Sequence, residues 1–469
     1  MIDLNTGPRS GIAFSRRAVL GGAGAMAVAS ALPAFAQQAT AVEDIVLSGG
    51  LVLSMEAGQG ATIADIHVRQ REIVQVAPKI DVPGARRIDL SGCIVMPGLV
   101  DTHWHMWNSL ARGFSMSKLG PFAKTMAPLA KAWTPEAAAL SVRLATTEAL
   151  NSGITTVNNW AHNTKSVEFA EAEYTAMTES GIRGRFSYGY PQALKPDARI
   201  DFDALGQFAD RHSDNNGLIH LGICTRGPDR SGSEIWKEEW AFARERRLPI
   251  TTHIASDRSA AAMQNIAIMS QGGFLGPDVQ LVHATHATRE DFRMIKKSGS
   301  PVSISPWTEL HVGYGVPPIA LMAETGVTMG LSVDNMVLSG NADMFSVMKV
   351  TADLAAGQTE TQGKVTDATV LEWAVPSGAA SLGLSDQVGA LAVGKRADII
   401  AVRMSDLNTV SAMSPAFAIT HSAQPANVQF VMVGGKVHKD GGSLTNIDVA
   451  ALTDEAEKTM ADLRQEVNL

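Results

Sequence analysis

Apolar and polar positions along the middle of the chain predict strands and helices in strict alternation. Short β-branched, apolar runs are each followed by a longer stretch of helical periodicity. The predicted strands are the run ending at 103–105 and then 153–158, 185–190, 219–225, 249–253, 279–283, 301–305 and 328–333. The predicted helices are 134–151, 167–179, 202–211, 233–246, 258–271, 289–297 and 317–325. Eight such units predict a closed parallel (β/α)8 barrel, an α/β fold, over residues 98–385. The alternative, an open doubly wound sheet, lacks a glycine-rich phosphate motif.

The pattern of apolar and polar residues at both ends of the chain differs from that of the middle. Residues 37–97 and 386–445 consist of short apolar runs separated by Gly, Pro and Asp, which is typical of antiparallel strands. We therefore expect one small β-sandwich built from both chain ends. The remaining tail, 446–469, is rich in Ala, Glu, Asp and Leu and predicts a terminal helix.

Composition indicates which classes of protein are compatible with this chain, but it does not identify a reaction. The chain has 469 residues, of which 45% are hydrophobic, so it can bury a large core. Its formal net charge is −8 and no basic run is present, which argues against nucleic acid as the partner. The two cysteines, Cys93 and Cys224, lie in separate apolar segments, and no disulfide framework is expected.

The first 36 residues have the layout of an export signal. Arg16 and Arg17 precede the uncharged stretch 18–32, which is too short and too rich in Gly and Ala to form a stable membrane span. Small residues at 34–36 then suit a cleavage site. This arrangement resembles a bacterial twin-arginine signal peptide. It predicts a periplasmic protein without stable membrane insertion once residues 1–36 are removed.

Four of the predicted barrel strands end in residues of the metal-binding type. His103 and His105 lie two apart, so a strand would point both imidazoles to the same side. The other strand ends carry His253, His283 and Asp334. Because the carboxyl ends of barrel strands meet at one face, we expect these five side chains to converge.

A group of several imidazoles and one carboxylate suits a divalent metal ion and metal-assisted hydrolysis. Water on such an ion has its pKa lowered from about 15.7 toward about 7. Asp334 can bind the metal and accept the proton of the water. His283 can hydrogen-bond the same water or polarise the bond that is cleaved. Asp334 and His283 are the predicted catalytic residues.

Three sequence motifs accompany these strand ends. They are Ile-Val-Met-Pro-Gly-Leu-Val-Asp-Thr-His at 94–103, Gly-Ile-Thr-Thr at 153–156, and Gly-Ala-Leu-Ala-Val-Gly-Lys-Arg-Ala-Asp at 389–398. With the order His-x-His, His, His, Asp along eight strands, they resemble the amidohydrolase superfamily, and within it the cytosine-deaminase and triazine-hydrolase branch. The resemblance covers residues 45–440. It implies a barrel enzyme with one catalytic divalent metal that hydrolyses a carbon–nitrogen or related bond, and it favours a homo-oligomer.

The resemblance also assigns roles by position. The implied metal ligands are His103, His105, His253 and Asp334. His283 would assist the water. No lysine ends the fourth strand at 223–226, so a single ion is expected rather than a bridged pair. Zinc is the expected ion, although Fe²⁺ and Mn²⁺ accept the same ligands.

One position departs from the pattern of the superfamily's deaminases. They carry a glutamate three residues after the histidine of strand five, and here that position is Ser256. A serine hydroxyl is a poor acid. Asp257 and Glu309 are candidate replacements. Asp257 can equally cap the helix that follows it, and Glu309 can equally be a solvated loop residue.

Several other residues near strand ends are candidates for contacting the substrate. Four tryptophans there can wall a pocket for an uncharged aromatic or heterocyclic molecule, or simply pack the top of the barrel: Trp104, Trp107, Trp160 and Trp307. The predicted substrate-binding residues are Trp107, His162, Arg226, Trp307 and Glu309. A structural role is expected for His286.

Three functions remain open from the sequence. The favoured one is metal-dependent hydrolysis of an amide, urea, carbamate or cyclic amide bond in a small molecule. The second is deamination of a heterocycle, with Glu309 or Asp257 supplying the proton. The third is a metal-binding barrel that has no catalytic activity.

Overall fold

The structure is a computed structural model that describes residues 44–118, 120–213 and 217–468. The predicted export signal at 1–36 lies outside this range and stays a prediction. Among the described residues, no helix combines the length and the apolar character needed to cross a membrane.

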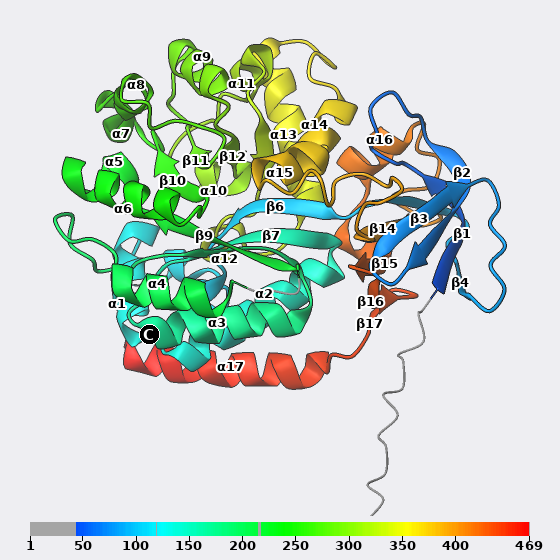
Figure 1. Cartoon of the computed structure of the whole chain (residues 1–469), viewed down its shortest axis with the longest axis horizontal. Helices are drawn as coiled ribbons and strands as arrows, with labels where there is room; N and C mark the ends of the chain where they lie inside the picture. The colour runs from blue at the N-terminus through cyan, green and yellow to red at the C-terminus, as the bar shows by residue number, and fades with distance from the viewer. Residues whose placement is uncertain (1–43, 119, 214–216, 469) are drawn as a thin grey trace, which may run out of the picture. The chain divides into compact units, whose positions relative to one another are not determined.

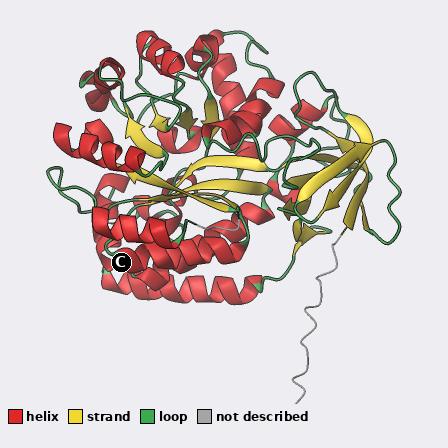
Figure 2. Ribbon diagram, viewed as in Figure 1, coloured by secondary structure: helices red, strands yellow, loops and turns green. Residues whose placement is uncertain are grey.

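Eight parallel strands form the barrel, in the order of the chain from β6 to β13 (Figures 1 and 2). Their bounds are β6 Leu99–Trp104, β7 Ile154–Ala161, β8 Arg183–Tyr188, β9 Ile219–Thr225, β10 Ile250–Ile254, β11 Val279–His283, β12 Val302–Ile304 and β13 Met329–Leu331. Each lies close to its predicted position; β8 begins and ends two residues earlier than expected. The barrel fold is therefore confirmed.

Helices surround the strands, as Figure 2 shows in red. Those of the barrel region are α1 Phe122–Ala132, α2 Pro135–Asn151, α3 Val167–Ser180, α4 Phe202–Arg211, α5 Gly227–Arg230, α6 Ser233–Glu245, α7 Arg258–Ala262, α8 Asn265–Gln271, α9 Arg289–Ser298, α10 Pro306–His311, α11 Ile319–Thr325, α12 Met336–Ser339, α13 Met344–Thr359, α14 Asp367–Ala374 and α15 Pro376–Ser381. The helix predicted at 258–271 is broken, because Gln264 adopts a left-handed backbone with φ 54°.

The first and last barrel strands are joined by a short seam. The Asp334 amide donates to the carbonyl of His103 at 3.1 Å, and the His105 amide donates to the carbonyl of Asp334 at 2.8 Å. The Asp101 carboxylate accepts from the amides of His103 at 3.1 Å and Val333 at 2.9 Å. Burial raises the pKa of Asp101 to about 8, although both of these bonds lower it. The same residues that close the barrel thus also orient the first and last candidate ligands.

A second, nine-stranded sheet is built from both ends of the described chain, as predicted. Its strands are β1 Asp44–Val52, β2 Thr62–Arg69, β3 Glu72–Ala77, β4 Arg86–Asp89, β5 Cys93–Pro97, β14 Ile399–Arg403, β15 Val428–Val433, β16 Lys436–Asp440 and β17 Ser443–Leu444. It encloses a separate apolar core that includes Ile66, Ile73 and Phe430. Most pairs are antiparallel, while β1 pairs in parallel with β4 and β5.

The run that carries the first histidines belongs to both sheets. β5 ends at Pro97 in the small sheet, and β6 begins at Leu99 in the barrel. Gly98 joins them, and a β-carbon there would lie 2.0 Å from the Thr155 hydroxyl oxygen, so only glycine fits. This close approach explains the Pro-Gly break in the apolar run.

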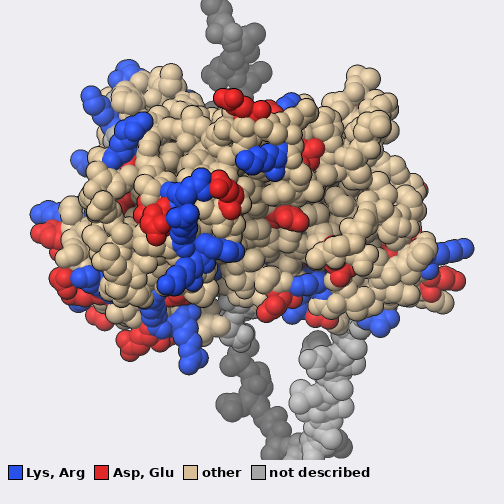
Figure 3. Space-filling view, turned by 90° about the horizontal axis from the view of Figure 1, so that it is seen from above, with Lys and Arg blue, Asp and Glu red and all other residues tan. Residues whose placement is uncertain are grey.

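The predicted terminal helix is α17, Val449–Glu466. It lies along α2 and α1 at the lower edge of Figure 1, where Met460 and Leu463 join a core cluster with Trp133. The surface is mixed in charge. On the face in Figure 3, Lys and Arg side chains stand beside Asp and Glu side chains, separated by wide uncharged areas. That face does not resemble a nucleic-acid-binding surface.

Candidate metal centre and active-site cavity

Three histidines and one aspartate converge at the carboxyl end of the barrel strands. His103 Nε2 lies 3.1 Å from His105 Nε2 and 3.3 Å from His253 Nε2. Asp334 Oδ1 lies 3.1 Å from His103 Nε2 and 3.3 Å from His105 Nε2. All four side chains are buried. The structure therefore brings together the four residues that the sequence pattern placed at separate strand ends.

These four distances are close to those between the ligand atoms of a tetrahedral metal ion. Four ligand atoms at about 2.0–2.1 Å from zinc are separated from one another by about 3.3 Å. Burial lowers the pKa of His103 to about 3 and lowers that of His105 and His253, so all three rings are neutral, as ligation requires. Burial alone would raise the pKa of Asp334, but His103 and His105 reverse this effect and hold it below the usual range. The donor set thus suits a divalent cation.

Two of the candidate residues stand on a strained backbone. His283, at the end of β11, has φ 72°, and Asp334, three residues past β13, has φ 62°. Left-handed conformations cost a non-glycine residue roughly 1–3 kcal/mol and cluster at functional sites. The turn directs both side chains into the barrel mouth, where His283 Nε2 lies 4.0 Å from Asp334 Oδ2.

Glu309 holds the far side of the His283 ring. Its Oε1 lies 3.1 Å from His283 Nδ1 and accepts the Ser305 amide at 3.0 Å. Glu309 is fully buried on α10, so the alternative of a solvated loop residue is wrong, and because it lies outside the cavity lining its predicted contact with substrate is not supported by its position. Burial raises its pKa, while the bond with His283 lowers it. With the Nδ1 proton directed to this carboxylate, Nε2 is the ring nitrogen that faces Asp334 and the cavity.

The other candidate acid, Asp257, has a structural position. Its carboxylate accepts the amides of Ser259 and Ala260 at 2.9 Å each and caps α7. Ser259 and Ala260 also lower its pKa, against a smaller effect of burial. Ser256 is buried beside it. Neither Ser256 nor Asp257 therefore supplies an unengaged carboxylate at the position of the deaminase glutamate.

His162 contacts a candidate ligand. Its Nδ1 lies 3.0 Å from His105 Nδ1 and accepts the Trp107 indole N–H at 3.0 Å. Such outer contacts fix the orientation of a metal-binding ring. Trp107 is itself fully buried against Trp133, away from the cavity lining, so its predicted role in substrate contact is not supported by its position. His162 does line the cavity.

A cavity of about 240 Å³ opens beside this cluster. Its lining consists of His105, Phe122, Met126, His162, Tyr190, Gln192, Arg226, Arg230, His253, His283, Thr308, Val312, Tyr314, Asp334, Asn335 and Leu338. This size suits a small molecule. None of the four tryptophans belongs to the lining. Trp104 and Trp160 are buried in the barrel, and Trp307 is 43% exposed outside it, bonded to Ser346. The predicted tryptophan wall is therefore wrong.

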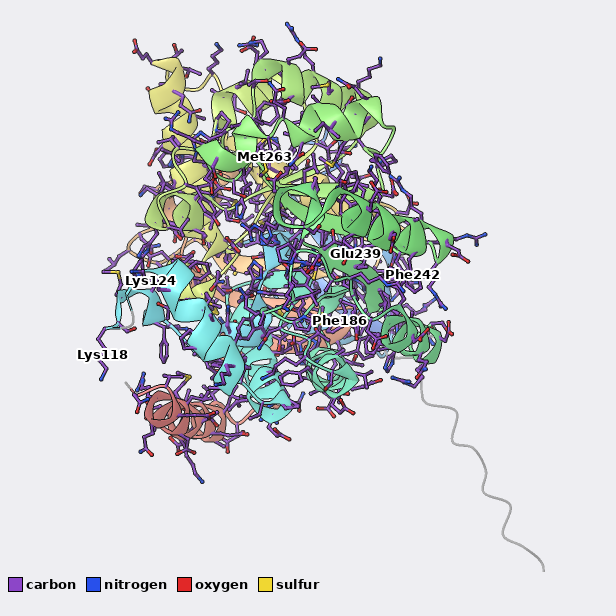
Figure 4. All side chains as sticks on the ribbon, turned by 90° about the vertical axis from the view of Figure 1, so that its left-hand side faces the viewer. Lys118, Lys124, Phe186, Glu239, Phe242 and Met263 are labelled. Carbon is purple, nitrogen blue, oxygen red and sulfur yellow. The ribbon has the colours of Figure 1, made fainter. Side chains whose placement is uncertain are left out.

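Arg226 lines the cavity, but its guanidinium is already bound to other groups of the protein. It donates to the backbone carbonyls of Leu194, Lys195 and Ala198, and it lies 3.7 Å from Glu239. Figure 4 labels Glu239 and Phe186 in the interior, in contrast to Lys118 and Lys124 at the edge. Arg226 therefore anchors the 194–198 loop, which argues against its predicted contact with substrate.

Among the lining residues that sequence reasoning missed, Arg230 and Tyr314 are the two with a direct bearing on the site. Tyr314 hydrogen-bonds Arg230 and packs its ring 5.3 Å from that of His283. Its carbonyl contacts His286 Nε2 at 2.6 Å, which gives His286 the structural role expected of it. Both residues lie beyond strand ends, in a short helix and a loop, where no periodicity marks them.

Comparison with known proteins places the chain. The amidohydrolase family matches residues 94–438. The chain belongs to the amidohydrolase family. The resemblance to the amidohydrolase superfamily is thus confirmed, and with it the prediction of a hydrolase acting on carbon–nitrogen bonds.

Relatives of this amidohydrolase span nearly its whole length. The 5'-deoxyadenosine deaminase of Methanobrevibacter smithii is 24% identical over 412 residues, covering 85% of this chain and 93% of its own. A zinc-bound adenosine deaminase from Xanthomonas campestris has a TM-score of 0.82 at 23% identity, covering 90% of this chain and 99% of its own. Zinc-bound atrazine chlorohydrolase from Arthrobacter aurescens has a TM-score of 0.76 at 20% identity, covering 88% and 99%. These structures share the fold of the amidohydrolase described here.

Proposed function

We propose that this amidohydrolase binds one zinc ion through His103, His105, His253 and Asp334 and hydrolyses an amide, urea, carbamate or cyclic amide bond in a small, aromatic or heterocyclic molecule. The observation that carries the proposal is a pair of buried groups that share His103 and lie beside a small cavity, namely His103, His105 and His253, and His103, His283 and Asp334. The two solved relatives that contain zinc support the choice of ion.

When bound, the ion supplies an activated water and polarises the group under attack. Asp334 accepts a proton at Oδ2, the oxygen that faces His283. His283 Nε2, which faces both Asp334 and the cavity, then takes this proton from Asp334 and delivers it to the departing nitrogen, so that Asp334 returns to its carboxylate form. Glu309 stabilises the resulting imidazolium through Nδ1, as the carboxylate does in other His–carboxylate pairs.

Deamination of a heterocycle is the second candidate, because deaminases are among the chain's relatives. A ring deaminase needs an acid that protonates the ring as well as one that protonates the leaving amine. With Ser256 at the glutamate position and Asp257 capping α7, the pair His283–Glu309 is the one acid–base system that we identify beside the candidate ligands among the described residues. One such pair suffices for amide-type cleavage, which we therefore favour.

Metal content and turnover together test the proposal. We expect one equivalent of zinc in the purified protein and a substoichiometric amount in His253→Ala and Asp334→Ala, with a control variant, His421→Ala, that retains it. His421 is a suitable control because it pairs with Asp367 on the outer helices. Full metal retention in both ligand variants would refute the site.

Turnover separates the two reactions. Amide, urea, carbamate and cyclic amide substrates are screened for amine or acid release, and aminated heterocycles for ammonia release. Cleavage in the first group that His283→Asn abolishes supports the favoured function. Activity confined to ammonia release from heterocycles would replace it with deamination.

A further inference from the structure

A positively charged side chain lines the cavity alongside the candidate metal ligands. Arg230, the last residue of α5, belongs to the cavity lining together with His253 and Asp334, and its side chain is accessible. The Tyr314 hydroxyl hydrogen-bonds its guanidinium. The ion pairs of the described residues do not include Arg230, although the charges of Asp229 and Asp257 act on it at longer range. Arg226, the other lining arginine, differs because loop carbonyls and Glu239 already occupy it.

The backbone beneath Arg230 is fixed against the end of β10. The Asp229 carboxylate accepts the Ala255 amide at 2.7 Å and the Asn265 side-chain amide at 2.8 Å. Gly227 has φ 62°, and a β-carbon there would lie 2.1 Å from the Thr252 hydroxyl oxygen. α5 therefore packs tightly against the strand that carries His253, and Arg230 starts from a rigid base.

The charge of the cavity is unbalanced. Arg230 lines the same cavity as the candidate ligands His105, His253 and Asp334, so its guanidinium lies on the side of the cluster that a substrate would occupy. Asp334 is the one carboxylate in the lining, and it belongs to that cluster. A cavity with a cation of this kind favours an anionic ligand, and the planar guanidinium fork matches a carboxylate in particular.

We propose that Arg230 binds a carboxylate of the substrate, so that the molecules hydrolysed here are small carboxylate-bearing amides, ureas or related compounds. This inference rests on the proposed function of the same cavity. It replaces the expectation of an uncharged substrate, which depended on tryptophan walls that the cavity lacks. The Tyr314 hydroxyl orients the guanidinium, and Asp229 and Gly227 position its helix.

Matched pairs of probes isolate the charge. N-benzoylglycine is compared with N-isobutylbenzamide, and N-carbamoylglycine with isobutylurea; in each pair an isopropyl group replaces a carboxylate of similar shape. Binding is measured by calorimetry on the zinc-loaded protein, and turnover by amine release. We expect the carboxylate member to bind at least about tenfold tighter, as hydrogen bonds to charged groups provide. We expect Arg230→Met to abolish that preference and Arg230→Lys to restore part of it.

The control is Arg289→Met, an exposed arginine of α9 that pairs with Glu324. It should keep the full preference. An equal affinity of wild type for both members, or a preference that survives in Arg230→Met because the metal alone provides it, overturns the inference. A carboxylate preference without any turnover supports the inference and counts against the proposed hydrolysis. Turnover of both members without a preference counts against the inference and supports the proposed hydrolysis.

Discussion

The two ends of the barrel both bury charged groups, but they treat them differently. At the amino end, Arg183 binds Asp398 through two bonds of 2.6 and 3.0 Å, and the remaining donors and acceptors reach the Gly434 amide and the Gly217 carbonyl. At the carboxyl end, by contrast, His103 Nε2 lies 3.1 Å from His105 Nε2 and 3.3 Å from His253 Nε2, so ring nitrogens face one another.

This difference indicates separate roles for the two ends of the barrel. A buried pair whose hydrogen bonds are all made stabilises one conformation, and here it ties the barrel to the small sheet through β8 and the residue before β14. A cluster of facing ring nitrogens, with a left-handed backbone at Asp334, is costly until a ligand lies between the ring nitrogens. The amino end therefore serves stability, and the carboxyl end binds a ligand and performs chemistry.

Removal of the predicted proton carrier should have the largest effect. Asn in place of His283 fills similar space but cannot carry a proton. We expect His283→Asn to lower kcat by about 10²–10⁴-fold while zinc remains at one equivalent. Metal analysis and steady-state kinetics measure both quantities. A near-normal kcat would mean that this end of the barrel works without its histidine.

Breaking the amino-end pair should reduce stability instead of activity. Asp398→Ala leaves the Arg183 guanidinium buried without its carboxylate, and we expect a loss of about 3–5 kcal/mol in the free energy of unfolding. Asp278→Ala, which removes the half-exposed partner of Arg244, is the matched control and should cost less than about 1 kcal/mol. Urea titration gives both values. Loss of zinc from folded Asp398→Ala would show that the two ends are not separable.

Glu309 offers an intermediate effect. Glu309→Gln keeps a hydrogen-bond acceptor for His283 but removes the charge that stabilises an imidazolium. We expect kcat to fall by about 10–100-fold with little change in metal content, in the range seen for outer partners of site residues. The exposed carboxylate of Glu324 supplies the comparison, since Glu324→Gln should leave kcat unchanged.

The smallest effect is expected at Asp257. As the cap of α7 it should contribute about 1 kcal/mol to the free energy of unfolding, and Asp257→Ala should lose that amount. Because its carboxylate is bound to two amides of α7, kcat should stay within about twofold of wild type, a margin far below the 10²-fold or more that an acid catalyst contributes. A larger fall in kcat would return Asp257 to the role of proton donor.

Much of this architecture is predictable from local pattern. Strand runs, helical periodicity and the position of His or Asp at strand ends depend on neighbours in sequence, and they located His103, His253 and Asp334 correctly within the fold. The Pro97–Gly98 break even marked the point where the chain leaves one sheet for the other.

What escaped prediction depends on contacts between distant segments. The side chain of Trp307 points away from the cavity to Ser346, and the Arg226 guanidinium turns to carbonyls of the 194–198 loop. Arg230 lines the cavity because α5 packs on β10. The local sequence of α5 does not predict this packing. Residue type and proximity to a strand end are therefore reliable for ligands on strands and unreliable for loops.

The seam at Asp101 bears on how the protein acquires its metal. Its carboxylate bonds a backbone amide 232 residues further along the chain, and the same closure brings Asp334 to the first histidines. Closing a loop of this length costs chain entropy before the contact contributes any stability. The complete ligand set thus exists only once nearly the whole barrel has assembled. Tight metal binding therefore follows the folding of the barrel and does not initiate it.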